Sequence, residues 1–218
     1  KVNPELYNHI DPALVGGDQR VLVTEMAGRA SVEMKSKELG YDIAGDVDRV
    51  THIVETVKDR ESKGWTFEAA DASFELILMS ADESESRFEV ESWRTIVEQD
   101  ASGDVRTEAT VKVRANGERM ISTAEGNGPV NALDKALRSA VTSLHPELEP
   151  LELIDYKVRI LEKSDADTSG TASVTRVLVS TSDGKREWTT LGVHENVIAA
   201  SWRALEDALT YGLMRSQA

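Results

Sequence analysis

The sequence predicts an α+β fold in which two β-β-β-α repeats follow one another and pack with pseudo-twofold symmetry. From Arg87 onward, stretches in which hydrophobic and polar residues alternate occur in two sets of three, and a helical stretch follows each set. Asn116-Gly117 and Asp183-Gly184 lie between such stretches and are strong hairpin signals. Alignment of Gly126 with Gly192 offsets the second repeat from the first by about 66 residues.

The elements of both repeats follow from this periodicity. The first repeat is expected to hold strands over residues 87–99, 108–114 and 118–125 and a helix over 130–144. The second is expected to hold strands over 151–160, 172–181 and 187–193 and a helix from 196 to about 214. Each helix can cover one face of its three strands, which predicts two sheets packed by their helices. Internal twofold symmetry also favours an isologous dimer.

A small, mainly helical linker subdomain is predicted before the repeats. Asp46 is a good N-cap, and the apolar stripe that follows it predicts a helix ending near Lys63-Gly64. A second helix is expected from Ala69 to Ala81, and the polar run from Ser80 to Ser86 is interpreted as a linker.

The first 45 residues have too little apolar mass to fold alone. They are expected to hold a turn at Gly16-Gly17-Asp18 and a short strand over residues 19–24. The predicted division of the chain is a linker subdomain at 1–45, a helical linker subdomain at 46–84 and a third domain at 85–218.

Composition excludes several classes of function. The formal net charge of −14 disfavours nucleic-acid binding, which depends on clustered Lys and Arg. No apolar run approaches the roughly 20 residues that cross a bilayer, so no membrane partner is expected. The chain has no cysteine, which excludes disulfides and thiolate chemistry and is compatible with a cytoplasmic location.

The sequence is poorly supplied with catalytic motifs. Its four histidines show none of the spacings that bind a metal, so no metal site or cofactor is expected in this chain. No Gly-x-Ser-x-Gly motif, phosphate loop or dinucleotide motif is present. The chain starts with Lys1 instead of methionine, and we expect it to be a piece of a longer protein.

Two strand-to-helix corners are candidate binding sites. They lie at residues 125–131 and 192–197, where the free N–H groups at the start of a helix favour a carboxylate. Caps and turns are the commoner explanation of such glycines and asparagines. Near the start of the chain, Tyr7 and His9 could enter a neighbouring active site as acid-base groups, or could equally be an anchoring aromatic residue and a cap.

Five segments carry a resemblance to the citramalate synthase branch of the isopropylmalate/homocitrate synthase family. Residues 3–16 and 64–76 resemble two linker elements that follow its catalytic barrel. Residues 124–137, 153–159 and 190–202 resemble its C-terminal regulatory domain. The resemblance covers essentially the whole chain, and its motifs occur in the family's order.

This resemblance implies a parent enzyme that condenses acetyl-CoA with a 2-oxo acid, which is pyruvate in citramalate synthases. The divalent metal and the base belong to a (β/α)₈ barrel that is absent here, so the chain alone is not expected to be catalytic. Tyr7, with Leu6 beside it, matches the linker tyrosine that enters the partner subunit's active site.

The resemblance also implies a homodimeric regulatory domain that binds an end-product amino acid between its repeats at the dimer interface. Isoleucine is expected for a citramalate synthase and leucine for an isopropylmalate synthase, with a ligand-free dimerisation domain as the alternative. By motif position, the effector-binding residues would be Val130, Asn131, Leu153, Tyr156, Ile160, Glu195 and Val197.

Overall fold

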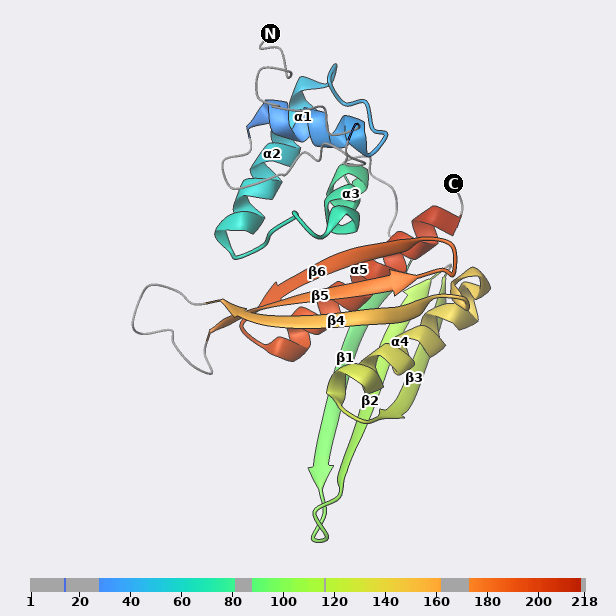
Figure 1. Cartoon of the computed structure of the whole chain (residues 1–218). Coiled ribbons are helices and arrows are strands. Elements are labelled where there is room, and N and C mark those ends of the chain that lie inside the picture. The colour runs from blue at the N-terminus through green and yellow to red at the C-terminus, as the bar shows by residue number, and fades with distance from the viewer. Residues whose placement is uncertain (1–13, 15–27, 81–87, 116, 162–172, 217–218) are drawn as a thin grey trace.

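The structure is a computed structural model and describes residues 14, 28–80, 88–115, 117–161 and 173–216 (Figure 1). Tyr7, the expected turn at 16–18, the expected strand at 19–24 and most of the expected linker at 80–86 lie outside the described residues. The order of elements confirms the predicted α+β class, with two three-stranded antiparallel sheets that are each followed by a long helix.

The described N-terminal part is a three-helix unit. It consists of α1 (Arg29–Glu38), α2 (Val47–Ser62) and α3 (Asp71–Ser80). The predicted N-cap is confirmed, because the Asp46 carboxylate accepts a hydrogen bond from the Arg49 N–H at 3.0 Å. A separate small core holds the unit together and contains Val32, Ile43, Val50, Ile53, Val57, Phe67, Phe74, Ile77 and Leu78.

Helix α1 was not predicted, because its sequence has almost no apolar stripe. The buried positions of α1 are Val32, Lys35 and Ser36, so two of the three are polar. The Ser36 hydroxyl donates to the Val32 carbonyl at 2.7 Å, and the Lys35 ammonium pairs with Asp71 of α3 at 2.9 Å. Packing against α2 and α3 therefore stabilises a helix that local periodicity does not reveal.

The first repeat consists of β1 (Glu89–Gln99), β2 (Val105–Ala115), β3 (Glu118–Gly126) and α4 (Pro129–Leu144). A short 3₁₀ helix, η3 (Pro146–Leu148), leads into the second repeat. This contains β4 (Glu152–Leu161), β5 (Val174–Ser182), β6 (Glu187–His194) and α5 (Val197–Ser216). Within each sheet the strands are antiparallel and follow the order of the sequence.

The two repeats correspond at an offset that differs slightly from the predicted one. Strand β3 ends at Gly126 and β6 at His194, while α4 begins at Pro129 and α5 at Val197. Both pairs are 68 residues apart, so Gly126 corresponds to His194 and not to Gly192. The register also shifts early in the first strand of each repeat, between Val90 and Ser92 in β1 and between Leu153 and Asp155 in β4. These equal irregularities make Trp93 and Tyr156 equivalent residues.

Each long helix covers the sheet of its own repeat, and the two helices meet in a shared core (Figure 1). Helix α4 packs on β2 and β3, and α5 packs on β5 and β6. Gly192 allows the closest approach, because a Cβ at this position would lie 1.9 Å from the Ala200 carbonyl oxygen of α5. This glycine therefore sets the distance between β6 and α5.

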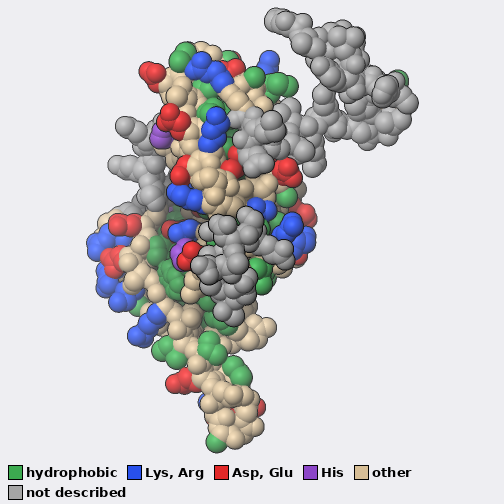
Figure 2. Space-filling view, turned by 90° about the vertical axis from the view of Figure 1, so that its left-hand side faces the viewer, with side chains coloured by type: hydrophobic (Ala, Val, Ile, Leu, Met, Phe, Trp, Pro, Cys, Tyr) green, Lys and Arg blue, Asp and Glu red, His purple; other side chains and the backbone are tan. Residues whose placement is uncertain are grey.

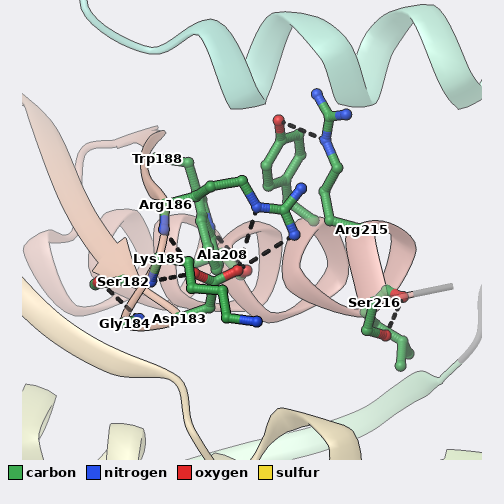
Figure 3. A network of polar contacts seen from close by, with 11 residues as sticks. Ser182, Asp183, Gly184, Lys185, Arg186, Trp188, Ala208, Arg215 and Ser216 are labelled. Atoms are coloured by element: carbon green, nitrogen blue, oxygen red, sulfur yellow. Dashed lines mark hydrogen bonds and ion pairs between the residues drawn. The ribbon is translucent and has the colours of Figure 1, made fainter. Parts of the chain in front are cut away.

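The predicted hairpin between β5 and β6 is confirmed. The Asp183 carboxylate accepts hydrogen bonds from the N–H groups of Lys185 and Arg186, at 2.9 and 2.7 Å (Figure 3). Gly184 has a φ of +80°, which other residues rarely adopt. At the other hairpin, Ala115 pairs with Glu118 and Gly117 has a φ of +79°.

The helical unit lies against the second sheet, next to β6 (Figure 1). The Ser73 hydroxyl of α3 accepts a hydrogen bond from the Leu191 N–H of β6 at 2.8 Å. The Arg176 guanidinium of β5 donates to the Gly64 carbonyl, with its Nε at 2.8 Å. The buried Glu75 of α3 accepts from Tyr211 at 2.9 Å and from Arg215 at 2.7 Å, both on α5. The linker helices are thereby fastened to the sheet and helix of the second repeat.

Candidate functional site

A pocket of about 410 Å³ lies where α4 begins and β4 passes beside it. The first repeat supplies the start of α4 and the loop before it, and the second repeat supplies the apolar face of β4. The lining residues are Asn127, Gly128, Pro129, Val130, Asn131, Asp134, Leu153 and Tyr156. The pocket therefore lies between the two repeats, and neither repeat forms it alone.

The start of α4 lacks a side-chain cap. Its N-cap is Gly128, which has an extended backbone and no side chain to accept a hydrogen bond, and Pro129 occupies the first helical position. The first N–H groups of a helix have no partner within the helix, so those of Val130 and Asn131 depend on solvent or a ligand. The Asn131 carboxamide oxygen instead accepts from the Asn127 N–H at 3.3 Å and steadies the preceding loop.

Tyr156 and Leu153 form the apolar wall opposite α4. The register shift in β4 places both side chains on the face of the sheet that carries the helices. The Tyr156 hydroxyl lies 2.7 Å from the Ser201 hydroxyl, which itself donates to the Val197 carbonyl at 2.7 Å. Because the single Ser201 proton is used there, Tyr156 donates to Ser201, and its ring is held in place along the pocket.

Asp134 brings a negative charge to the wall of the pocket. It lies one helical turn after Val130 and Asn131, and its side chain is 16% exposed. The Arg138 guanidinium donates from Nε to Asp134 Oδ1 at 2.8 Å and from Nη1 to the Leu151 carbonyl at 2.5 Å. Burial raises the pKa of the Asp134 carboxyl, and the Arg138 charge partly offsets this rise.

With this geometry established, comparison with known proteins decides the family. A sequence profile described as the LeuA allosteric (dimerisation) domain matches residues 68–213. The chain belongs to this family.

Relatives of the chain include both synthases expected from its motifs. The (R)-citramalate synthase of Streptomyces coelicolor is 61% identical over 220 residues, covering 99% of this chain and 40% of the relative. The (R)-citramalate synthase of Aquifex aeolicus is 39% identical over 99% of this chain and 40% of the relative. The 2-isopropylmalate synthase of Acetivibrio thermocellus is 29% identical over 93% of this chain and 37% of the relative. The chain thus spans about 40% of the length of the citramalate synthases that it matches.

The structure of this LeuA dimerisation domain brings together four of the predicted effector-binding residues. Val130, Asn131, Leu153 and Tyr156 all line the pocket at the start of α4. The loop residues 127–129, which belong to the candidate corner at 125–131, line it as well, and so does Asp134, which was not predicted. Two signals were available for Asp134: its position three residues after Asn131 on the same helical face, and its pairing with an arginine four residues on.

Ile160, Glu195 and Val197 do not line this pocket. Cross-strand pairing joins Ile160 to Thr175 and Thr175 to His194, which places all three predicted residues at the end of the second sheet where α5 begins. Ile160 is 62% exposed and Val197 is 39% exposed, and Glu195 is also exposed. They are surface residues of the described chain, and none of them is among the residues that line the pocket.

The second strand-to-helix corner of the LeuA dimerisation domain is closed by its own side chains. Asn196 is the residue equivalent to Gly128, and its carboxamide oxygen accepts from the N–H groups of Ile198 and Ala199 at 2.8 and 3.1 Å. Trp202, equivalent to Asp134, stacks on Trp93, equivalent to Tyr156, with 5.5 Å between ring centroids. Cap and core geometry therefore accounts for the asparagine and the aromatic residues at this corner.

Among the residues that the structure describes, no cluster of three or more His, Asp or Glu side chains is arranged to hold a metal ion. None of the described helices combines the length and the apolar character needed to span a membrane.

Proposed function

We propose that this chain is the regulatory region of an acyltransferase of the citramalate synthase type, in which the acyl group becomes an alkyl group on transfer. The parent would condense acetyl-CoA with pyruvate, using a divalent metal held outside this chain, and Tyr7 would act only beside that catalytic part. The regulatory region would bind an end-product branched-chain amino acid, isoleucine first, for feedback inhibition. A cytoplasmic location fits this role.

The single observation that carries the proposal is the open pocket between an uncapped helix start and an apolar wall. A zwitterionic amino acid can place its carboxylate at the N–H groups of Val130 and Asn131, where the helix dipole also favours negative charge. Its aliphatic side chain then contacts Leu153 and Tyr156. The volume of about 410 Å³ lies within the range of small-molecule sites, about 300–1,000 Å³.

A homodimer is the second part of the proposal. The family description names dimerisation, and the described surface carries hydrophobic side chains that a second copy could cover. Val158 and Ile160 are exposed on β4, and Val97 and Val105 are exposed on the β1–β2 hairpin. This hairpin forms the narrow lower end of the molecule in Figure 2, where hydrophobic side chains reach the surface.

The test is a thermal-unfolding panel with isoleucine, leucine and valine, together with analytical ultracentrifugation of the same chain. A ligand at one hundred times its dissociation constant adds about 2.7 kcal/mol of stability, which shifts the melting temperature measurably. Isoleucine is expected to give the largest shift on a dimer, and a larger shift with leucine would assign the chain to the isopropylmalate synthase type. A folded dimer that responds to none of the three would leave only a structural dimerisation role.

Asn131→Ala and Tyr156→Ala separate the regulatory role from the structural one. In a sensor both variants weaken the thermal shift with isoleucine, because both residues line the pocket. In a ligand-free dimerisation domain they would alter dimer stability alone.

A further inference from the structure

We propose that Asp134 binds the ammonium group of the effector, so that the pocket selects amino acids over 2-oxo acids with the same carbon skeleton. This inference rests on the proposed function, because it concerns the same pocket. It assigns a specificity-determining role to a residue outside the expected effector-binding set.

The position of Asp134 fits an α-amino acid held at the start of α4. A helical side chain leans toward the N-terminus of its helix, so a residue at i+4 lies over residue i on the same face. The Asp134 carboxylate therefore lies on the face of α4 that carries Val130. The N–H group of Val130 would donate a hydrogen bond to the ligand carboxylate. In an amino acid the ammonium and carboxylate groups share one carbon atom, so they require a donor group and an acceptor group close together.

The negative charge of the Asp134 carboxylate favours a cationic group of the ligand. Of the eight residues that line the pocket, Asp134 alone carries a carboxylate, and none carries a cationic side chain. A carboxylate offers about four acceptor positions on its two oxygens, and Arg138 uses Oδ1. The ammonium group of an amino acid can add a charge-assisted hydrogen bond there, whereas the carbonyl oxygen of a 2-oxo acid would be repelled.

The second repeat shows how this arrangement is altered where no ligand has room. At the positions equivalent to Asp134 and Arg138, α5 carries Trp202 and Glu206, and the Trp202 indole N–H donates to Glu206 at 2.9 Å. Both repeats thus link these two positions by a hydrogen bond along the helix. In the first repeat the acidic residue, Asp134, faces a cavity. In the second repeat the equivalent residue is Trp202, and Trp93 stacks on its ring. Of the two equivalent corners, only the open one therefore has an acidic side chain that faces its pocket.

Selectivity of this kind matches the proposed role. The parent enzyme would act on a 2-oxo acid, and its end product would be an amino acid. A regulatory pocket that bound both classes equally would respond to substrate as well as to product. Recognition of the ammonium group separates the two classes without relying on the aliphatic side chain, which product and precursor can share.

The experiment compares isoleucine with 3-methyl-2-oxopentanoate by isothermal titration calorimetry on the whole chain, as wild type, Asp134→Asn and Arg138→Gln. The wild type is expected to prefer isoleucine by at least tenfold, and Asp134→Asn to lose most of that preference while its affinity for the oxo acid stays the same or rises. Arg138→Gln removes the ion pair but keeps the carboxylate, so it serves as the matched control and retains the preference. A role of Asp134 in folding alone would affect both variants alike.

Two results would overturn the inference and can be told apart. If the wild type binds isoleucine and Asp134→Asn shows the same ratio of affinities, Asp134 does not recognise the ammonium group, although the proposed function stands. If the wild type binds neither isoleucine nor its oxo acid while folded, the inference and the proposed function fail together.

Discussion

Replacement of Gly128 by asparagine should close the pocket with the protein's own cap. Gly128 and Asn196 are equivalent N-cap residues, and Asn196 already satisfies two N–H groups of α5 at 2.8 and 3.1 Å. The backbone of Gly128 is extended, and a Cβ added there would meet no atom within 4 Å. An asparagine side chain can therefore adopt the same capping geometry and accept hydrogen bonds from the N–H groups that the ligand carboxylate needs.

Typical energies of N-caps and of hydrogen bonds to charged groups give the expected size of both effects. Asparagine stabilises an N-cap relative to glycine by only a few tenths of a kcal/mol, so Gly128→Asn should be as stable as the wild type or slightly more stable. Hydrogen bonds to a charged group contribute about 1.5–3 kcal/mol, so loss of the carboxylate contact should weaken isoleucine binding by about 10- to 150-fold. An unchanged or stabilised fold with weakened binding is a combination that general damage to the protein cannot produce.

Calorimetric titration with isoleucine and thermal unfolding without ligand measure the two quantities. Asn196→Gly is the matched control, because it removes the cap at the closed corner and should cost a few tenths of a kcal/mol without changing isoleucine affinity. If Gly128→Asn folds normally and binds isoleucine as tightly as the wild type, the carboxylate does not lie at the start of α4. The site would then have to be sought elsewhere, for example around Ile160 and Val197.

Two further predictions concern stability. Gly192→Ala should destabilise the chain by about 1–3 kcal/mol in denaturant titrations, because its Cβ would lie 1.9 Å from the Ala200 carbonyl oxygen; Gly45→Ala, with open space around its Cβ, is the control and should change little. Burial raises the pKa of Asp207 to about 7, against the opposing effect of Arg60. The folded chain therefore binds a proton that the unfolded chain releases near pH 4, and stability from this group is lost as the pH rises toward 7. Between pH 5 and pH 8 the stability of Asp207→Asn relative to the wild type should therefore rise by about 2–3 kcal/mol, and a difference independent of pH would contradict the assignment.

Local sequence signals predicted most of the fold. They failed for elements whose structure depends on contacts with residues far away in the sequence. The strands and α4 were predicted because alternating residues, paired hairpin signals and a proline at the first helical position all lie within a few residues of one another. Helix α1 has no such signal, and Lys35 becomes a buried residue only because Asp71 of α3 lies beside it. The offset of the repeats was misjudged because both glycines pack closely against the helix that follows, Gly126 against Ala132 and Gly192 against Ala200, although the two glycines are not equivalent positions.

The pocket itself depended on information that no single segment carries. The motif at 124–137 indicated the start of α4, but only the packing of the two repeats brings Leu153 and Tyr156 to it. Glu195 and Val197, which the resemblance also implied, lie outside this pocket and flank Asn196, whose side chain caps α5. The sequence contains both Gly128 and Asn196, but only the structure shows that they are equivalent N-cap residues and can be compared.

The two repeats have equivalent strand-to-helix corners, and these differ at three equivalent positions. All three differences favour an open pocket at the first corner and a filled space at the second. Glycine at 128 leaves helix N–H groups available where Asn196 uses them, and Asp134 faces a cavity where Trp202 fills the space. Tyr156 forms a wall of the cavity where Trp93 stacks on Trp202. Together they confine the pocket to the contact of α4 with β4, so we expect calorimetry to find one isoleucine per chain and two per dimer.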